Sequence, residues 1–198
     1  GVVNGTVILI GKMNPLIATF GVSIILQGCA LIITPRPLSP SPEIFKQLIR
    51  GRILGFPYVF FIGIALFAII QIVLNHTKYG RRLFAVGENP VAAAWSGLKV
   101  TSTKYIAFIT CSVMAVMASW YLYGRTGAAE SVVNTQMTLD SVAYALIGGG
   151  SFSGGKGSIG GSVLAIFSVV ILMNILNQLE VGTYAKDVIT DALLVAIE

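Results

Sequence analysis

A glycine-rich stretch of the chain has the spacing of a nucleotide-binding loop. Within GGGSFSGGKG (148–157), Gly150, Gly155 and Lys156 match the pattern G-x-x-x-x-G-K, in which backbone amides and a lysine hold phosphate oxygens. That chemistry also requires a Ser or Thr hydroxyl after the lysine for Mg²⁺, a strand before the loop and a soluble helix after it. Gly157 follows Lys156, and apolar segments flank the stretch. We therefore interpret the stretch as a structural turn or as a contact for another protein.

Two carboxylates near the end of the chain are candidates for proton transfer. Asp187 and Asp191 lie one helical turn apart in a largely apolar segment. An ionised group is costly inside a bilayer, so such residues often mark a proton path. Lys186 precedes Asp187, however, and a solvated or ion-paired structural role fits the same residues. Both interpretations stay open at this point.

A polar stripe lies on the first long apolar segment. Thr19, Ser23 and Gln27 are spaced i, i+4 and i+8, which places them on one face of a helix. In lipid such a face must meet other helices or water. The stripe therefore predicts either hydrogen bonds between helices or the lining of a polar substrate path.

Few residues are suited to catalysis or metal binding. His76 is the only histidine, and no His, Cys and carboxylate cluster has the spacing of metal ligands. Cys29 and Cys111 both lie inside apolar runs, which favours inert thiols over a disulfide. We expect no catalytic residues, no metal site and no cofactor bound by this chain.

The composition predicts that these residues lie on membrane-spanning helices and their connections. Of 198 residues 55% are hydrophobic and 11% are charged, against about 25% charged in soluble domains. The apolar residues come in runs of about twenty, the length that crosses the hydrocarbon core of a bilayer. We predict an all-α polytopic membrane protein, a single transmembrane domain of about five membrane segments, one of them a half helix. The expected spans are 15–34, 56–75, 105–124, 139–150 (the half helix), 157–177 and 184–198.

The charged residues lie mostly in the connections between these spans. The chain carries 13 Lys and Arg residues and a formal charge of +5, but they are spread out and predict no nucleic-acid partner. Five of them lie in residues 76–104, which favours a cytoplasmic position for this connection. Within it we expect a short amphipathic helix over Pro90–Gly97 with Asn89 as its N-cap.

Two long motifs resemble one transporter family. TKYGRRLFAVGENPVAAAWSGLKV (77–100) is similar to the cytoplasmic loop of ribose-type ABC transporter permeases, within the branched-chain amino acid and monosaccharide permease family. LDSVAYALIGGGSFSGGKGSIGGSVLAI (139–166) looks like a second family motif, and GVVNGTVILIGKMNPLIATFGVSIILQG (1–28) like a third. Thr190 and Asp191 depart from the family, which often has Lys-Gly near this position. Because such permeases are longer, we expect this chain to be the C-terminal portion of one.

The resemblance implies a mechanism and a set of partners. It implies alternating access in the bacterial cytoplasmic (inner) membrane, a second permease subunit in a homodimer or heterodimer, a cytoplasmic ATP-binding subunit that carries ATP and Mg²⁺, and an extracytoplasmic sugar-binding protein. It also implies that the ATPase meets two cytoplasmic segments, whose residues are Gly87, Glu88, Asn89, Ala92 and Ala93 in the first and Gly154, Gly155 and Lys156 in the second.

Three alternatives stay open. One is a proton-coupled carrier that uses Asp187 and Asp191. Another is a permease of the same family for branched-chain amino acids or nucleosides. The third is a structural subunit without a pathway of its own. The sequence does not name the sugar, and it does not decide which of the two cytoplasmic segments makes the main contact.

Overall fold

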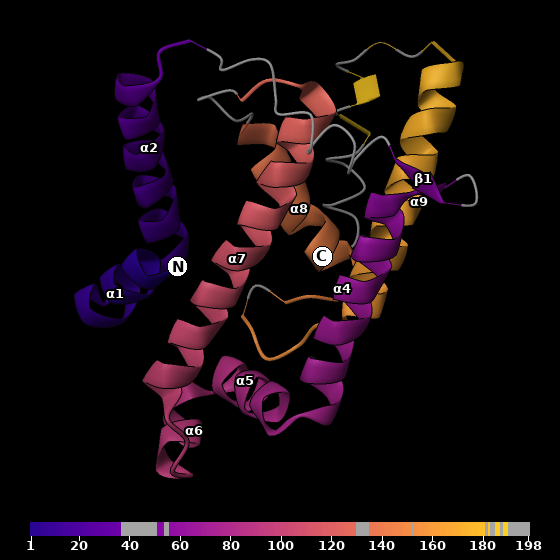
Figure 1. Ribbon diagram of the computed structural model, residues 1–198. Coiled ribbons are helices and arrows are strands. Elements are labelled where there is room, and N and C mark those ends of the chain that lie inside the picture. Colours follow the sequence, from indigo (N-terminus) through magenta and orange to yellow (C-terminus); the bar gives the residue numbers. More distant parts are fainter. Residues whose placement is uncertain are drawn as a thin grey trace. The chain divides into compact units, whose positions relative to one another are not determined.

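The fold is almost entirely helical (Figure 1). The structure is a computed structural model that describes residues 1–36, 51–53, 56–129, 135–151, 153–180, 182, 185–186 and 188–189. The described elements, in chain order, are α1 (Val2–Gly11), α2 (Pro15–Ile33), β1 (Arg52–Ile53), β2 (Phe56–Pro57), α4 (Tyr58–His76), α5 (Lys78–Glu88), α6 (Pro90–Trp95), α7 (Val100–Thr126), α8 (Thr135–Ile147) and α9 (Ile159–Gln178).

Four of these helices, α2, α4, α7 and α9, are long and apolar enough to cross a membrane. Their large side chains are widely exposed on the isolated chain, as Leu26 (64%) and Leu164 (70%) show. A surface of this kind is stable only against lipid or other helices. The predicted all-α polytopic class is therefore confirmed. The predicted span 184–198 lies mostly outside the described residues, and so do Asp187 and Asp191.

The helix boundaries follow local chemistry more closely than the apolar runs do. The α2 helix begins as predicted at Pro15, where the Asn14 carboxamide accepts the Leu16 N–H at 2.9 Å. The α4 helix begins at Tyr58 and not at residue 56, because Phe56 and Pro57 pair with β1 in a short antiparallel ladder. The α7 helix begins at Val100 and not at residue 105, so it includes polar residues that precede the apolar run.

The predicted half helix is α8, whose 13 residues rise about 20 Å against a hydrocarbon core of ~30 Å. It ends before the glycines and not at residue 150. The Gly149 N–H donates to Leu146 O at 2.8 Å and the Gly150 N–H donates to Ala145 O at 2.9 Å. With Gly149 at φ 91, these bonds form a Schellman motif, which satisfies the last carbonyls of the helix and turns the chain away.

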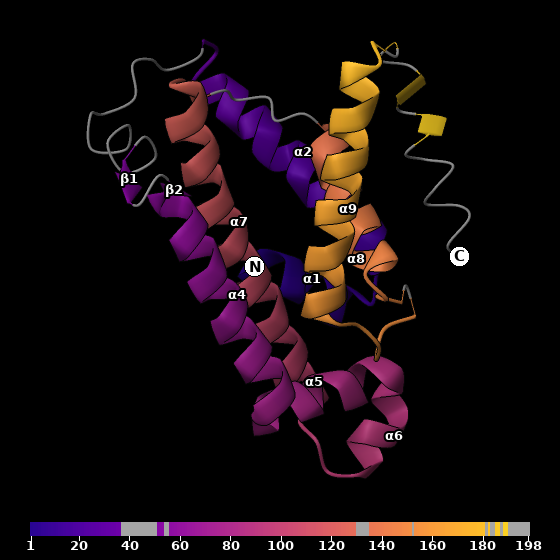
Figure 2. The same cartoon turned by 90° about the vertical axis from the view of Figure 1, so that its right-hand side faces the viewer.

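By chain contacts the molecule divides into two compact units, which are described separately. The first contains Gly1–Ile69 with Val91–Val133, and the second contains Ile70–Pro90 with Asn134–Glu198. In the first unit α1 packs against α7 and α2. In the second unit α8 packs against α9, and the end of α8 approaches the start of α9 in both views (Figures 1 and 2).

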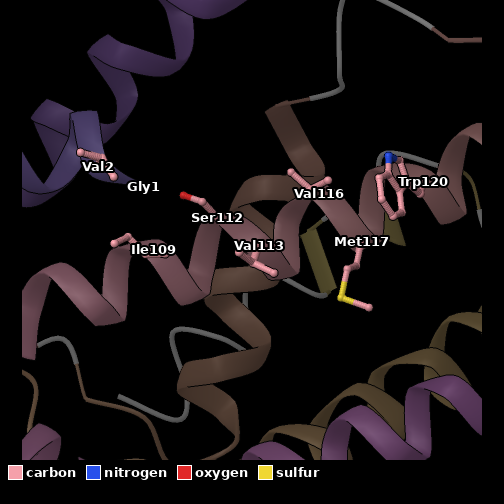
Figure 3. Close-up of a pocket in the computed structure, with 8 residues that line it drawn as sticks. All are labelled: Gly1, Val2, Ile109, Ser112, Val113, Val116, Met117 and Trp120. Carbon is pink, nitrogen blue, oxygen red and sulfur yellow. The ribbon is translucent and has the colours of Figure 1, made fainter.

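The contact between α1 and α7 in the first unit depends on two glycines. A Cβ on Gly1 would lie 2.8 Å from Ile109 Cα, and one on Gly5 would lie 2.7 Å from the Tyr105 ring. Above this contact the start of α1 and one face of α7 border an apolar groove of about 500 Å³ (Figure 3). Its lining residues are Gly1, Val2, Ile109, Ser112, Val113, Val116, Met117 and Trp120.

Candidate functional site

The corner between α4 and α5 sets the direction of the first predicted contact segment. Thr77 is the N-cap of α5, and its hydroxyl accepts the Gly80 N–H at 3.2 Å and donates to Val73 O. A Cβ on Gly80 would overlap the Leu74 carbonyl. The motif Thr-x-Tyr-Gly therefore has a physical basis, since the hydroxyl caps the helix and only glycine fits the corner.

The α5 helix was not predicted from the sequence, although a signal was present. Tyr79, Leu83 and Val86 are spaced i, i+4 and i+7, which is the period of one helix face. Val86 is 1% exposed and is the most deeply buried side chain among the described residues. The rest of the helix surface carries exposed basic residues, namely Lys78, Arg81 and Arg82. The helix is thus amphipathic and is not one of the four candidate spans.

The end of α5 meets the second predicted contact segment backbone to backbone. A Cβ on Gly87 would lie 2.6 Å from the Gly155 N, and one on Gly154 would lie 2.8 Å from Gly87 O. A Cβ on Gly155 would lie 2.6 Å from both Cα and Cβ of Glu88. We call this three-glycine contact (Gly87, Gly154 and Gly155) the glycine seam. Residues 87–88 and 154–155, which are far apart in the sequence and were predicted in separate segments, thus lie against each other.

The second segment is held in shape by its own hydrogen bonds. We call residues 148–151 and 153–158 the glycine loop. The Gly154 N–H donates to Ser151 O at 3.0 Å, and the Ser153 N–H donates to the Ser151 hydroxyl at 3.2 Å. Ser158 ends the loop as the N-cap of α9, where its hydroxyl accepts the Gly161 N–H at 3.3 Å. Gly154 and Gly155 have φ 83 and φ 74, conformations that favour glycine.

Two opposite charges border the seam. Glu88 and Lys156 are both exposed, and neither forms an ion pair or a hydrogen bond through its side chain within the described part of the chain. Asn89, also exposed, follows α5 in an extended conformation, and its N–H donates to Ala85 O at 3.2 Å. The seam therefore presents a glutamate and a lysine that are available to another molecule.

The remaining predicted contact residues lie on α6. This helix ends at Trp95, two residues before the predicted end at Gly97, which has φ 78. Ala92 is exposed, whereas Ala93 is 5% exposed and its carbonyl accepts the Leu98 N–H. Both alanines belong to the first unit and the glycine seam belongs to the second.

The two hydroxyls of the polar stripe on α2 donate hydrogen bonds within their own helix. The Thr19 hydroxyl donates to Pro15 O at 2.9 Å, and the Ser23 hydroxyl donates to Phe20 O at 2.8 Å. These bonds use the hydroxyl hydrogens, and the hydroxyl oxygens can still accept further hydrogen bonds. Gln27 is half-buried on the same helix. Both interpretations of the stripe remain predictions.

Two buried polar groups were not singled out from the sequence. Asn4 Oδ1 and the Tyr79 hydroxyl are buried without a hydrogen-bond partner in the described part of the molecule. Burial also raises the pKa of Tyr79 above its ordinary value of 10.0. Nothing in a single sequence separates such groups from surface Asn and Tyr residues.

The chain combines apolar helices of membrane-spanning length with the amphipathic helix α5 and the glycine loop. These features define a polytopic membrane protein. The chain belongs to the family described as the branched-chain amino acid transport system / permease component, whose model matches residues 1–197. The resemblance inferred from the three motifs is thereby confirmed. Together with the four apolar helices, family membership makes the chain a multi-pass protein of the inner membrane.

Curated relatives cover nearly the whole chain. The ribose import permease protein of Bacillus subtilis is 32% identical over 94% of this chain and 59% of its own length. The ribose import permease protein of Escherichia coli K12 is 29% identical, over 96% and 60% respectively. The galactose/methyl galactoside import permease protein of the same strain is 28% identical, over 98% and 60%. The chain thus spans about three fifths of the length of these relatives. No solved structure matches it.

Proposed function

We propose that this chain forms part of the membrane-spanning permease of an ATP-driven importer that carries a monosaccharide by alternating access. The names of the relatives support the substrate class, because they are import permeases for ribose and galactosides. The glycine seam with its two exposed charges supports the coupling to an ATPase. ATP and Mg²⁺ are bound by that partner, and this chain receives the resulting motion.

The ATPase contacts Glu88 and Lys156 in this proposal. Both side chains are exposed and neither has an ion-pair partner in the described residues, so each can pair with a charge on a cytoplasmic subunit without breaking an existing bond. Complementary charges at a protein interface fix its register and exclude wrong partners. The exposed basic face of α5, with Lys78, Arg81 and Arg82, agrees with a position on the cytoplasmic side.

The other parts of the proposed importer are a second permease subunit, identical or homologous, and an extracytoplasmic sugar-binding protein. The four spanning helices leave large apolar surfaces exposed. In a membrane these surfaces contact lipid and further helices of the assembly. The polar stripe of Thr19, Ser23 and Gln27 is the proposed lining of the sugar path.

Charge reversal tests the coupling surface. In the full-length permease, reconstituted with its ATPase and binding protein, Glu88→Lys or Lys156→Glu is expected to lower both uptake and binding-protein-stimulated ATP hydrolysis about tenfold, equivalent to ~1.4 kcal/mol of docking free energy. Arg125→Glu is a matched control, because Arg125 is exposed on the last turn of α7. Unchanged activity in both seam variants would reject the coupling role. Uptake driven by a proton gradient without the ATPase would reject the importer itself.

A further inference from the structure

We infer that the glycine seam locks the end of α5 to the glycine loop, so that both segments move as one rigid body during transport. The inference rests on the proposed function for its role in coupling, but the rigidity concerns this chain alone. It answers which of the two segments makes the main contact, since neither acts separately.

The glycine seam is a contact between two backbones, not between side chains. At a side-chain contact a displaced partner can change rotamer and restore the packing. At the seam each glycine instead meets backbone atoms, namely Gly155 N, Gly87 O and Glu88 Cα. Backbone atoms have no rotamers, and packed surfaces resist small displacements because they offer few intermediate arrangements. The seam therefore either holds or separates completely.

The glycine loop is in turn joined closely to the membrane-associated helices α8 and α9. A Cβ on Gly148, at the end of α8, would overlap the backbone of Ser162 in α9, and one on Gly161 would overlap the Gly148 carbonyl. The Schellman motif after α8 and the Ser158 cap of α9 fix both ends of the loop. A force applied at Glu88 or Lys156 thus reaches α8 and α9 through two successive backbone contacts.

A consequence follows for how the ATPase drives the permease. If the two segments were independent, each could follow its own contact with the ATPase. Because they are joined, a displacement of either charge moves α5, the glycine loop and the α8–α9 pair together. The loop glycines then serve to fix a shape, whereas the same residues in a flexible linker would loosen it.

A distance measurement tests the rigidity directly. Spin labels at Arg82→Cys on α5 and Ser153→Cys in the loop, both exposed positions, are placed in full-length permease in which Cys29 and Cys111 are replaced by alanine. The assembled transporter in nanodiscs is expected to show one narrow distance that is the same without nucleotide, with ATP and after hydrolysis. A change of several ångströms between these states would overturn the inference.

Alanine variants test the glycines themselves. Gly87→Ala or Gly155→Ala is expected to broaden the distance and to lower sugar transported per ATP hydrolysed roughly fivefold, at the low end of allosteric couplings. The double variant Gly87→Ala with Gly155→Ala should transport no less sugar per ATP than the more impaired single variant, because either alanine already opens the seam. Gly157→Ala is the control, since its Cβ would lie at an ordinary 3.8 Å from Gly150 Cα.

The two proposals fail in different ways. If the importer proposal is wrong, the ATPase does not engage the permease, yet the label distance stays narrow and still broadens in the alanine variants. If the rigid seam is wrong, ATP-driven uptake persists, and Gly87→Ala matches Gly157→Ala in both label distance and transport per ATP.

Discussion

Two helix contacts in this molecule use glycine in different ways. In the first unit Gly5 of α1 lies under the ring of Tyr105 on α7, and in the second unit Gly161 of α9 lies under the carbonyl of Gly148. At Gly5 the neighbour is a side chain, which can rotate, although Gly1 in the same α1–α7 contact meets the backbone of Ile109. At Gly161 the neighbour is backbone, which cannot move without the helix. Gly5 should therefore tolerate changes that Gly161 does not.

The two contacts also differ in what makes them specific. The Tyr105 hydroxyl donates to the Thr6 hydroxyl at 3.1 Å, which in turn donates to Val2 O at 2.9 Å. A polar bond between helices fixes their register in lipid. In the described structure the α8–α9 contact at Gly148 and Gly161 is specified by close backbone approach instead. Small residues allow this approach, which increases van der Waals contact between helices.

The largest expected effect is at the backbone contact. Gly161→Ala or Gly148→Ala should lower the free energy of unfolding by about 3 kcal/mol or more, because overpacking a site that cannot rearrange is the severe case. Thermal unfolding of the permease in nanodiscs measures this. Gly160→Ala is the control, since its Cβ would lie 3.6 Å from the Ser158 hydroxyl and should change little. Equal melting temperatures for Gly160→Ala and Gly161→Ala would contradict the comparison.

A smaller effect is expected at the side-chain contact. Gly5→Ala should lower the free energy of unfolding by only about 1–2 kcal/mol, because the Tyr105 ring can move aside. Tyr105→Phe removes only the hydroxyl and should cost about 1 kcal/mol, the usual net value of one hydrogen bond. In the double variant Gly5→Ala with Tyr105→Leu, the alanine should lower the free energy of unfolding less than it does in the presence of Tyr105. If Gly5→Ala lowered the free energy of unfolding as much as Gly161→Ala does, the two positions would not differ as expected.

The smallest effect concerns a group that uses neither kind of contact. The Tyr79 hydroxyl is buried without a hydrogen-bond partner in the described residues, so Tyr79→Phe should leave stability unchanged or raise it slightly at neutral pH. Because burial raises the pKa of Tyr79 in the folded chain, the unfolded chain loses this proton first as pH rises past about 10. Stability is then lost at alkaline pH, and the phenylalanine variant should lose less. Identical unfolding curves at pH 9 and 11 for both proteins would contradict this.

Much of the molecule could be predicted from local patterns. Apolar runs of membrane length predicted α2, α4, α7 and α9, because burial in hydrocarbon depends on composition along the chain. The errors lie at the helix ends, where Phe56 joined a strand and the glycines after Ile147 formed a Schellman motif. These ends depend on hydrogen bonds to particular neighbours, which hydropathy does not contain.

The amino-acid sequence was sufficient for the membrane class and the family, since composition and motif order are properties of the chain itself, whereas the two contact segments stay a prediction. It could not show that Gly87 meets Gly155, because these residues lie far apart in the chain and glycine carries no side chain to reveal a partner. Only the tertiary structure places Glu88 and Lys156 at one seam. Gly155, one of the residues that suggested a phosphate loop, lies in the folded chain where two backbones touch.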